Sequence, residues 1–233
     1  MKKLFLFILL GLAGALVSRA QDADSLKFKP VHIGVLLQGN YSGESMYIAE
    51  FKMSAYPDLG VELGTFVDYH LTRDLFIEVQ LVLALQNGTY VATDYDPGFL
   101  FWNKRKLSNL ADMSLIGMDI PLYLSGQIAV GTGHIRLGAG PYTHFTFDSW
   151  SPGDRDFVTP YKRIVSEDEA TGSSRYALSD SHAGIGLYVG YEFESGLQFN
   201  LGAKYSVLDI INYESERSHA HPYKRTFGAG WRF

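Results

Sequence analysis

The fold of this chain is decided by two neighbouring stretches, Ala183-Gly-Ile-Gly-Leu-Tyr-Val-Gly-Tyr-Glu-Phe193 and Gly196-Leu-Gln-Phe-Asn-Leu-Gly-Ala-Lys-Tyr-Ser-Val207. In both, the odd positions are apolar and the even positions are mostly glycine or polar. A period of two indicates a β-strand, and about ten residues is the length at which a tilted strand crosses a membrane. The two stretches, separated by Glu194-Ser195, therefore predict a hairpin of a transmembrane barrel.

Six further segments repeat this alternation, and the connections between all eight segments are alternately long and short. The expected strands are 31–41, 59–70, 75–86, 113–124, 134–147, 183–193, 196–207 and 223–233, with long connections at 42–56, 87–111, 148–180 and 209–222. Pro121 lacks an amide proton, so a local irregularity is expected in its strand. The pattern predicts an all-β fold, an eight-stranded antiparallel up-and-down transmembrane β-barrel with periplasmic termini, short periplasmic turns and longer external loops.

A soluble, lipocalin-like barrel is the structural alternative, because it also has eight alternating strands. Its apolar set would point inward and its polar set would meet water. Here the set opposite the apolar face is rich in glycine, which suits a narrow lumen better than a solvated exterior. The membrane barrel is therefore the favoured interpretation.

The N-terminus has the pattern of a secretory signal peptide. Met1-Lys2-Lys3 is followed by an apolar run from Leu4 to Val17 and by Ser18-Arg19-Ala20. This pattern predicts a cleaved signal peptide over 1–20 and a mature outer-membrane β-barrel domain over 21–233. The expected location is the outer membrane of a Gram-negative bacterium.

Composition excludes several classes of function. There are 0 cysteines, which excludes disulfide frameworks, zinc-thiolate sites and a cysteine nucleophile. Without the three basic residues of the signal peptide, 17 Lys and Arg face 25 Asp and Glu, a formal charge of -8. An acidic chain of this kind is not expected to bind nucleic acid.

Aromatic residues gather near the strand ends on the apolar phase and predict two girdles at the membrane surfaces. The expected periplasmic girdle contains Tyr69, Tyr191, Phe193, Trp231 and Phe233, and the outer one Tyr41, Phe145, Phe147 and Tyr205. A final strand that ends in an aromatic residue resembles the signal read by the barrel-insertion machinery. Phe233 is therefore the expected contact with that partner.

Four short motifs lie in the second half of the chain: Asp119-Ile-Pro-Leu-Tyr123, Leu137-Gly-Ala-Gly-Pro-Tyr142, Gly184-Ile-Gly-Leu with Gly190-Tyr-Glu192, and Lys204-Tyr205. With these motifs, the chain resembles the PorT-type outer-membrane β-barrel family of Bacteroidota over about half of its mature length. The resemblance implies the barrel and its location. Because one member is associated with protein secretion, it also raises secretion components as partners.

The polar phase predicts a charged lumen. Its expected members are His32, Glu62, Asp68, Glu78, Gln80, Asp119, Arg136, His144, Glu192, Gln198, Asn200, Lys204 and Arg232. Buried charges persist when they are paired, so Arg136 and Lys204 are expected to pair with carboxylates such as Asp119, Glu78 and Glu192. The set forms either a polar plug, which is favoured, or a narrow ion or proton path.

Catalytic and metal sites find weak support. His144, Asp148 and Ser149 lie near one strand end, but His144-Phe-Thr146 replaces the His-x-Ser pair of lipid A deacylases, and His144 has the inward phase. His219-Ala-His221 lacks a third ligand at regular spacing. We therefore expect no enzyme activity, no catalytic, cofactor-binding or metal residues, and no cofactor.

Two loop segments are candidate contact sites. Trp102 beside Lys104-Arg105-Lys106 is placed to reach lipopolysaccharide phosphates or to pack on a neighbouring loop. Glu167-Asp-Glu169 is interpreted as a solvated acidic cluster, with a cation site as the alternative. The expected function is a non-enzymatic membrane component with outer-membrane lipids and lipopolysaccharide as partners. The alternatives are a secretion accessory, a small-solute pore and, last, a lipid-modifying enzyme.

Overall fold

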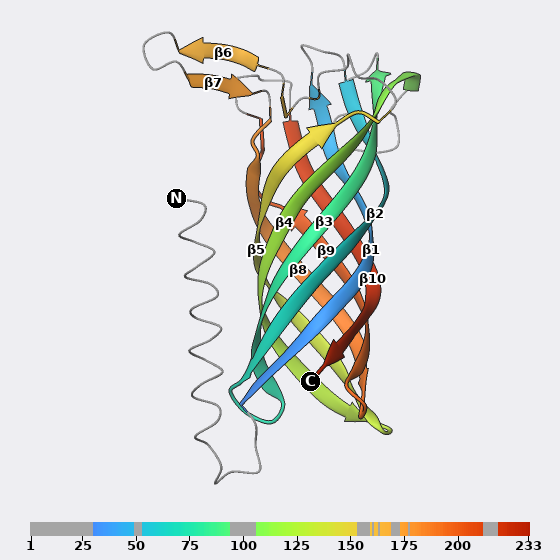
Figure 1. Ribbon diagram of the computed structural model, residues 1–233, viewed down its shortest axis with the longest axis vertical. Coiled ribbons are helices and arrows are strands. Elements are labelled where there is room, and N and C mark those ends of the chain that lie inside the picture. Colours follow the sequence, from blue (N-terminus) through green and yellow to red (C-terminus); the bar gives the residue numbers. More distant parts are fainter. Residues whose placement is uncertain are drawn as a thin grey trace.

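Eight long strands close into an antiparallel barrel in this computed structural model (Figure 1). The structure describes residues 30–48, 53–93, 106–152, 159, 161–162, 164–168, 173–176, 178–211 and 219–233. The barrel strands are β1 (Val31–Ile48), β2 (Met53–His70), β3 (Leu75–Thr93), β4 (Lys106–Val130), β5 (Gly133–Trp150), β8 (Ser181–Phe193), β9 (Leu197–Ser206) and β10 (His219–Arg232). β6 (Ile164–Asp168) and β7 (Ser173–Tyr176) form a separate two-stranded sheet. The predicted fold class is confirmed.

The register fixes the tilt of the strands. One row of paired residues starts at Tyr41, passes through Arg225, Ala203, Leu187, Ala139, Leu124, Ile77 and Tyr69, and returns to β1 at Val31. The row therefore returns ten residues from its start, which is a shear number of 10. With the usual spacings within and between strands, this shear tilts the strands by about 40°. An eight-stranded barrel of this kind has an interior that side chains can fill.

The strands are longer than the sequence pattern predicts, mainly at the end away from the short turns at 71–74, 131–132 and 194–196. Much of the expected loops 42–56 and 87–111 continues the ladders of β1 to β4, and the expected loop 148–180 contains β6 and β7. Most of 125–133 is also strand, around a turn at 131–132. The apolar alternation ends earlier because it depends on what the side chains face, whereas backbone pairing continues beyond that region.

The turns at the opposite end are short, as predicted. Gly131 and Gly196 have φ angles of 63° and 85°, a conformation that glycine adopts without steric cost. In the turn between β2 and β3, the Thr72 hydroxyl oxygen accepts hydrogen bonds from the amides of Asp74 and Leu75.

Pro121 interrupts pairing without shifting it. Ile120 and Pro121 form no ladder pairs with β3, while the register on either side is unchanged. The expected irregularity is thus a gap, and the nearby register shift lies at Ile116 and Gly117, against β5.

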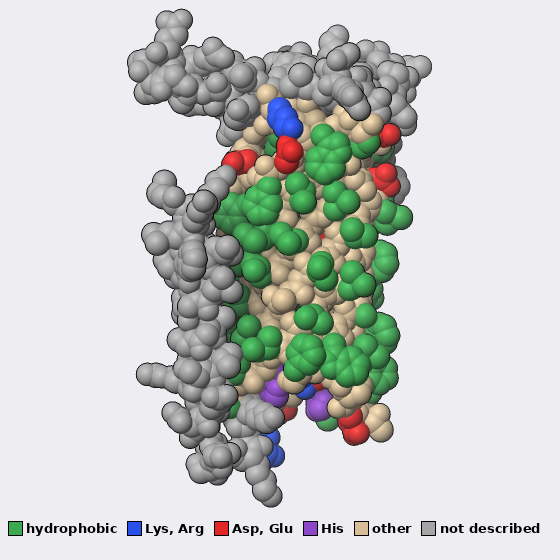
Figure 2. Space-filling view, viewed as in Figure 1, with side chains coloured by type: hydrophobic (Ala, Val, Ile, Leu, Met, Phe, Trp, Pro, Cys, Tyr) green, Lys and Arg blue, Asp and Glu red, His purple; other side chains and the backbone are tan. Residues whose placement is uncertain are grey.

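The outer surface of the barrel is apolar. Exposed large apolar side chains lie on each of the eight barrel strands, among them Leu37, Leu63, Leu124, Leu187 and Leu201, which are 55–64% exposed. Figure 2 shows hydrophobic side chains over the middle of the visible face, with most of the charged groups at its two ends. The residues of the two expected girdles point outward near the strand ends, and the Tyr191 hydroxyl donates a hydrogen bond to the carbonyl of Val130. Among the described residues, no helix has the length and hydropathy needed to cross a membrane.

Candidate functional site

The interior of the barrel holds the predicted charged set. Twelve of its members point into the barrel and have buried or half-buried side chains. The side chain of the thirteenth, Arg232, is 17% exposed. Ten of the thirteen lie in two groups along the barrel, which we name the lower cluster, near the short turns, and the upper cluster.

Arg136 is the centre of the lower cluster. This cluster contains Asp68, Glu78, Arg136, Tyr188, Glu192, Gln198 and Arg232, and it draws on six of the barrel strands. One guanidinium nitrogen of Arg136 lies 2.9 Å from Asp68 Oδ2 and 2.7 Å from Glu78 Oε2. The other lies 2.9 Å from Glu192 Oε2 and 3.2 Å from Gln198 Oε1. The planar guanidinium offers five N–H donors in a fixed fork and so serves several acceptors from two nitrogens, whereas a lysine has its three donors on a single nitrogen.

Neighbouring groups complete the lower cluster. Arg232 forms a second ion pair with Glu192, and the Tyr188 hydroxyl donates a hydrogen bond of 2.8 Å to Glu78. The ring of Phe76 lies 4.6 Å from the guanidinium carbon of Arg136, within the range of a cation–π contact. Arg136 is therefore completely buried, yet its charge is compensated on several sides.

Asp119 is the centre of the upper cluster, which also contains Glu62, His144, Lys204 and Lys224. Asp119 Oδ2 lies 2.6 Å from Lys204 Nζ and 2.8 Å from Lys224 Nζ, and its Oδ1 lies 2.6 Å from His144 Nδ1. Lys224 also reaches Glu62 at 2.7 Å. The predicted pairing is thus confirmed: Arg136 pairs with Glu78 and Glu192, and Lys204 pairs with Asp119.

Little space separates the two clusters. A cavity of about 10 Å³ lies between Lys204 of the upper cluster and Tyr188 of the lower one, and Gln38, Gln80 and Tyr123 also line it. This volume accommodates about one water molecule. Across the two clusters, four cations face five carboxylates, so the lumen is nearly neutral and well filled.

A small apolar core closes the barrel above the upper cluster. Its buried members come from the strand extensions and from the connections: Ala55, Tyr90, Met113, Leu115, Leu178, Ile210 and Ala220. Leu178 forms a β-bridge with Ile211, which ties together the connections before β8 and after β9. The Ser149 and Thr159 hydroxyls are 2.6 Å apart and attach the segment after β5 to the same region.

Glu44 lies in this outer region, three residues beyond Tyr41 of the outer girdle. Its carboxyl accepts a hydrogen bond from the Tyr161 hydroxyl, and its side chain is buried. Burial raises the pKa of Glu44 from its ordinary value of 4.5 to about 7, against a smaller lowering by the Tyr161 hydroxyl. Glu44 therefore titrates near neutral pH.

The residues considered for catalysis do not form one site. His144 contacts Asp119 and lies 3.3 Å from the Thr146 hydroxyl, inside the barrel. Asp148 pairs instead with Lys162 at the exposed rim, where hydrogen bonds from Lys162 and the Ser149 amide lower its pKa. The Ser149 hydroxyl is hydrogen-bonded to the Thr159 hydroxyl. The His144, Asp148 and Ser149 side chains thus have separate partners.

The other candidates have equally simple surroundings. His221 stacks on Tyr205, with ring centroids 6.2 Å apart. Among the described residues, no group of three potential metal ligands comes together. Trp102, Lys104, Arg105 and Glu169 lie outside the described residues, while Lys106 begins β4, and Glu167 and Asp168 end β6.

Sequence reasoning missed Lys224 and Glu44. Lys224 follows the same inward phase as Thr226 and Arg232, so the alternation of β10 was sufficient to find it. Glu44 stands where the apolar alternation has already ended, so no comparable signal marked it.

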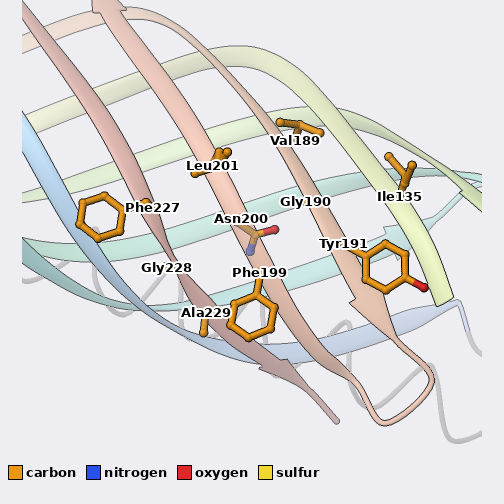
Figure 3. Close-up of a pocket in the computed structure, with 10 residues that line it drawn as sticks. All are labelled: Ile135, Val189, Gly190, Tyr191, Phe199, Asn200, Leu201, Phe227, Gly228 and Ala229. Carbon is orange, nitrogen blue, oxygen red and sulfur yellow. The ribbon is translucent and has the colours of Figure 1, made fainter.

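The lipid-facing side carries a groove on β5, β8, β9 and β10 (Figure 3). Its volume is about 720 Å³, and its walls are the outward side chains of Ile135, Val189, Tyr191, Phe199, Leu201 and Phe227. The glycines Gly190 and Gly228 and the small Ala229 lower the surface between these walls. The groove offers shape and apolar contact but no catalytic group.

A closed barrel with a paired, charged lumen and an apolar exterior defines the class of fold. Neither a protein-family model nor a curated protein sequence matches the chain. Among solved structures, the chain is similar to the outer membrane protein OprG of Pseudomonas aeruginosa, with 18% identity, 87% of this chain and 96% of that chain covered, and a TM-score of 0.49. It is also similar to neisserial surface protein A, with 12% identity, coverage of 86% and 97%, and a TM-score of 0.44.

A third similar structure is the outer membrane protein AlkL in lipid bilayers, with 12% identity, coverage of 91% and 94%, and a TM-score of 0.41. At such identities the likeness concerns fold alone, and the strand pairing described above establishes the barrel independently. The PorT-type resemblance and the signal peptide stay predictions.

Proposed function

We propose that this protein is an integral outer-membrane barrel that acts as a non-enzymatic membrane component with a plugged lumen. The observation that carries the proposal is the inverted polarity of the barrel. Arg136, Asp119 and Glu62 are buried inside, while leucines such as Leu37 and Leu63 are exposed outside. Exposing so extensive an apolar outer surface to water would cost free energy, whereas contact with membrane hydrocarbon would not.

The lumen supports a plug rather than a pore. The lower cluster joins side chains of six strands across the barrel, and the upper cluster joins five. A conducting path would have to break charge-assisted hydrogen bonds, which are the strongest class in proteins. With the lumen closed, interactions with other molecules fall to the outer surface and the external connections.

Single-channel conductance tests this proposal. The mature chain, residues 21 to 233, is refolded into planar bilayers, with insertion checked by heat-modifiable migration on gels. We expect inserted protein without steady conductance steps. Lys162→Ala removes an exposed cation at the rim and serves as the control for a change outside the lumen. A large porin in the same bilayer shows that the assay detects channels.

Steady conductance of the wild-type barrel would replace the plug with the small-solute pore. Arg136 and Lys204 would then be the residues to mutate for ion selectivity. Failure of the refolded chain to insert would contradict the membrane location itself.

The secretion role rests on the family resemblance. It predicts that deletion of the gene stops export of specific proteins across the outer membrane. Normal export in the deletion strain would remove this alternative and leave the structural role.

A further inference from the structure

Arg225 is exceptional on the outer surface of the barrel. Between the two aromatic girdles, it is the one charged side chain on the outward phase of the described strands. Its neighbours along β10, Lys224 and Thr226, point inward, whereas Arg225 is exposed with Phe227. Among the described residues, Arg225 has no ion-pair partner.

Tyrosines surround Arg225 toward the outer end. The register places Tyr41 of β1 directly beside it, and Tyr223 lies one outward position further along β10. Tyr223 is paired with Tyr205 of β9 and with Gly43 of β1. The register thus places Tyr41, Tyr223 and Arg225 at neighbouring outward positions of β1 and β10.

A guanidinium at this position needs an anionic partner. An arginine on the lipid face of a barrel destabilises it at the membrane centre, and the cost falls toward the interface as the side chain reaches polar groups. Arg225 lies at the outer edge of the apolar belt, where its side chain can extend between the tyrosine hydroxyls. Phosphate oxygens match the fork of an arginine and accept hydrogen bonds from tyrosine.

The apolar groove starts directly below this position. Its β10 wall begins at Phe227, one outward position from Arg225, and its β9 wall begins at Leu201, one outward position from Ala203. Ala203 is paired with Arg225, so the outward residue beside Arg225 on β9 has a small side chain. A cationic and phenolic head site thus continues into an apolar groove.

We propose that Arg225, with the hydroxyls of Tyr41, Tyr205 and Tyr223, binds the phosphate of an outer-leaflet lipid headgroup, and that an acyl chain of this lipid occupies the groove. The inference rests on the proposed outer-membrane location. It differs from the loop contact expected at Trp102, because every residue involved lies on a barrel strand.

Native mass spectrometry of the detergent-refolded full mature chain tests the site with lipid A as the probe. We expect the wild type to retain lipid A, and Arg225→Gln to lower the retained fraction about tenfold or more, the effect of losing a charge-assisted pair. Arg225→Lys should fall in between, because it keeps the charge and loses the fork. Lys162→Gln is the matched control, because it removes a cation that already pairs with Asp148. This variant should bind lipid A as the wild type does.

Three results would overturn the proposal. The first is equal retention of lipid A by the wild type and Arg225→Gln, and the second is equal retention of dephosphorylated lipid A by the wild type. The third is displacement of lipid A by millimolar inorganic phosphate, which would indicate a site for the free anion. Unfolding in lipid-free detergent adds a separate check. If Arg225→Gln loses as much stability there as it does with lipid A present, the partner of Arg225 lies within the chain.

The outcome can be separated from that of the proposed function. If Arg225→Gln folds and inserts but binds lipid A as well as the wild type, the lipid site fails and the membrane barrel stands. If neither protein inserts, the membrane location fails first.

Discussion

Replacing Arg136 with methionine tests whether the lower cluster stabilises the barrel. Methionine keeps much of the side-chain volume, so the packing around Phe76 changes little. The replacement removes the cation that lies 2.7–2.9 Å from Asp68, Glu78 and Glu192. These three carboxylates then share one remaining cation, Arg232.

The structure sets the size of the expected effect. Breaking a buried ion pair by removing one partner typically costs about 3–5 kcal/mol. Here a single side chain serves three carboxylates, so we expect the upper end of that range, about 5 kcal/mol at neutral pH. Arg136→Lys should lose less, because it retains the charge without the bidentate geometry.

Urea unfolding in lipid vesicles, followed by tryptophan fluorescence and heat-modifiable migration, measures this loss. Lys162→Met is the control, because its pair with Asp148 is more than half exposed and surface pairs contribute little. An Arg136→Met barrel as stable as the wild type, or more stable, would refute the idea that the cluster supports the fold. That result would mean that an apolar plug of similar volume performs equally well.

Three further predictions concern single positions. Tyr188→Phe removes the hydroxyl that donates to Glu78 and should cost about 1–3 kcal/mol in the same urea assay; an unchanged midpoint would contradict the bond. Glu44 binds its proton more tightly when folded, so its stabilisation is complete below about pH 4.5 and is lost as the pH rises through about 7. Between these limits the wild type should lose about 3 kcal/mol relative to Glu44→Gln, and parallel pH profiles would count against the buried carboxyl. Gly140→Ala should lower the yield of folded barrel, because its new Cβ would lie 2.1 Å from the carbonyl oxygen of Leu122; a wild-type yield would show that the strands can separate there.

The sequence by itself determined the class of fold and the side of the sheet on which each residue lies. Alternation is a local property, because successive side chains of a strand point to opposite faces. It was enough to place Arg136, Asp119 and Lys204 inside the barrel and Leu187 and Phe199 outside. The short turn at Gly196 and the outward aromatic residues followed from the same local signals.

The ends of the strands could not be predicted in this way. Beyond the apolar belt, the outward side chains no longer face one kind of environment, so the period of two disappears. Backbone pairing continues nonetheless, and it extends β1 to Ile48 and β3 to Thr93. The apolar core around Tyr90 and Leu178 depends on segments far apart in the sequence, which no local pattern relates.

Only the tertiary structure decided which charges meet. Asp68 and Asp119 both point into the barrel, but the shear of 10 sets their positions along the barrel axis. That register brings Asp68 to Arg136 and Asp119 to Lys204 and Lys224. It also sets Arg225 beside Tyr41, directly above the apolar groove. Strand register is a relation between distant segments, so the partners of each charge become visible only when the barrel closes.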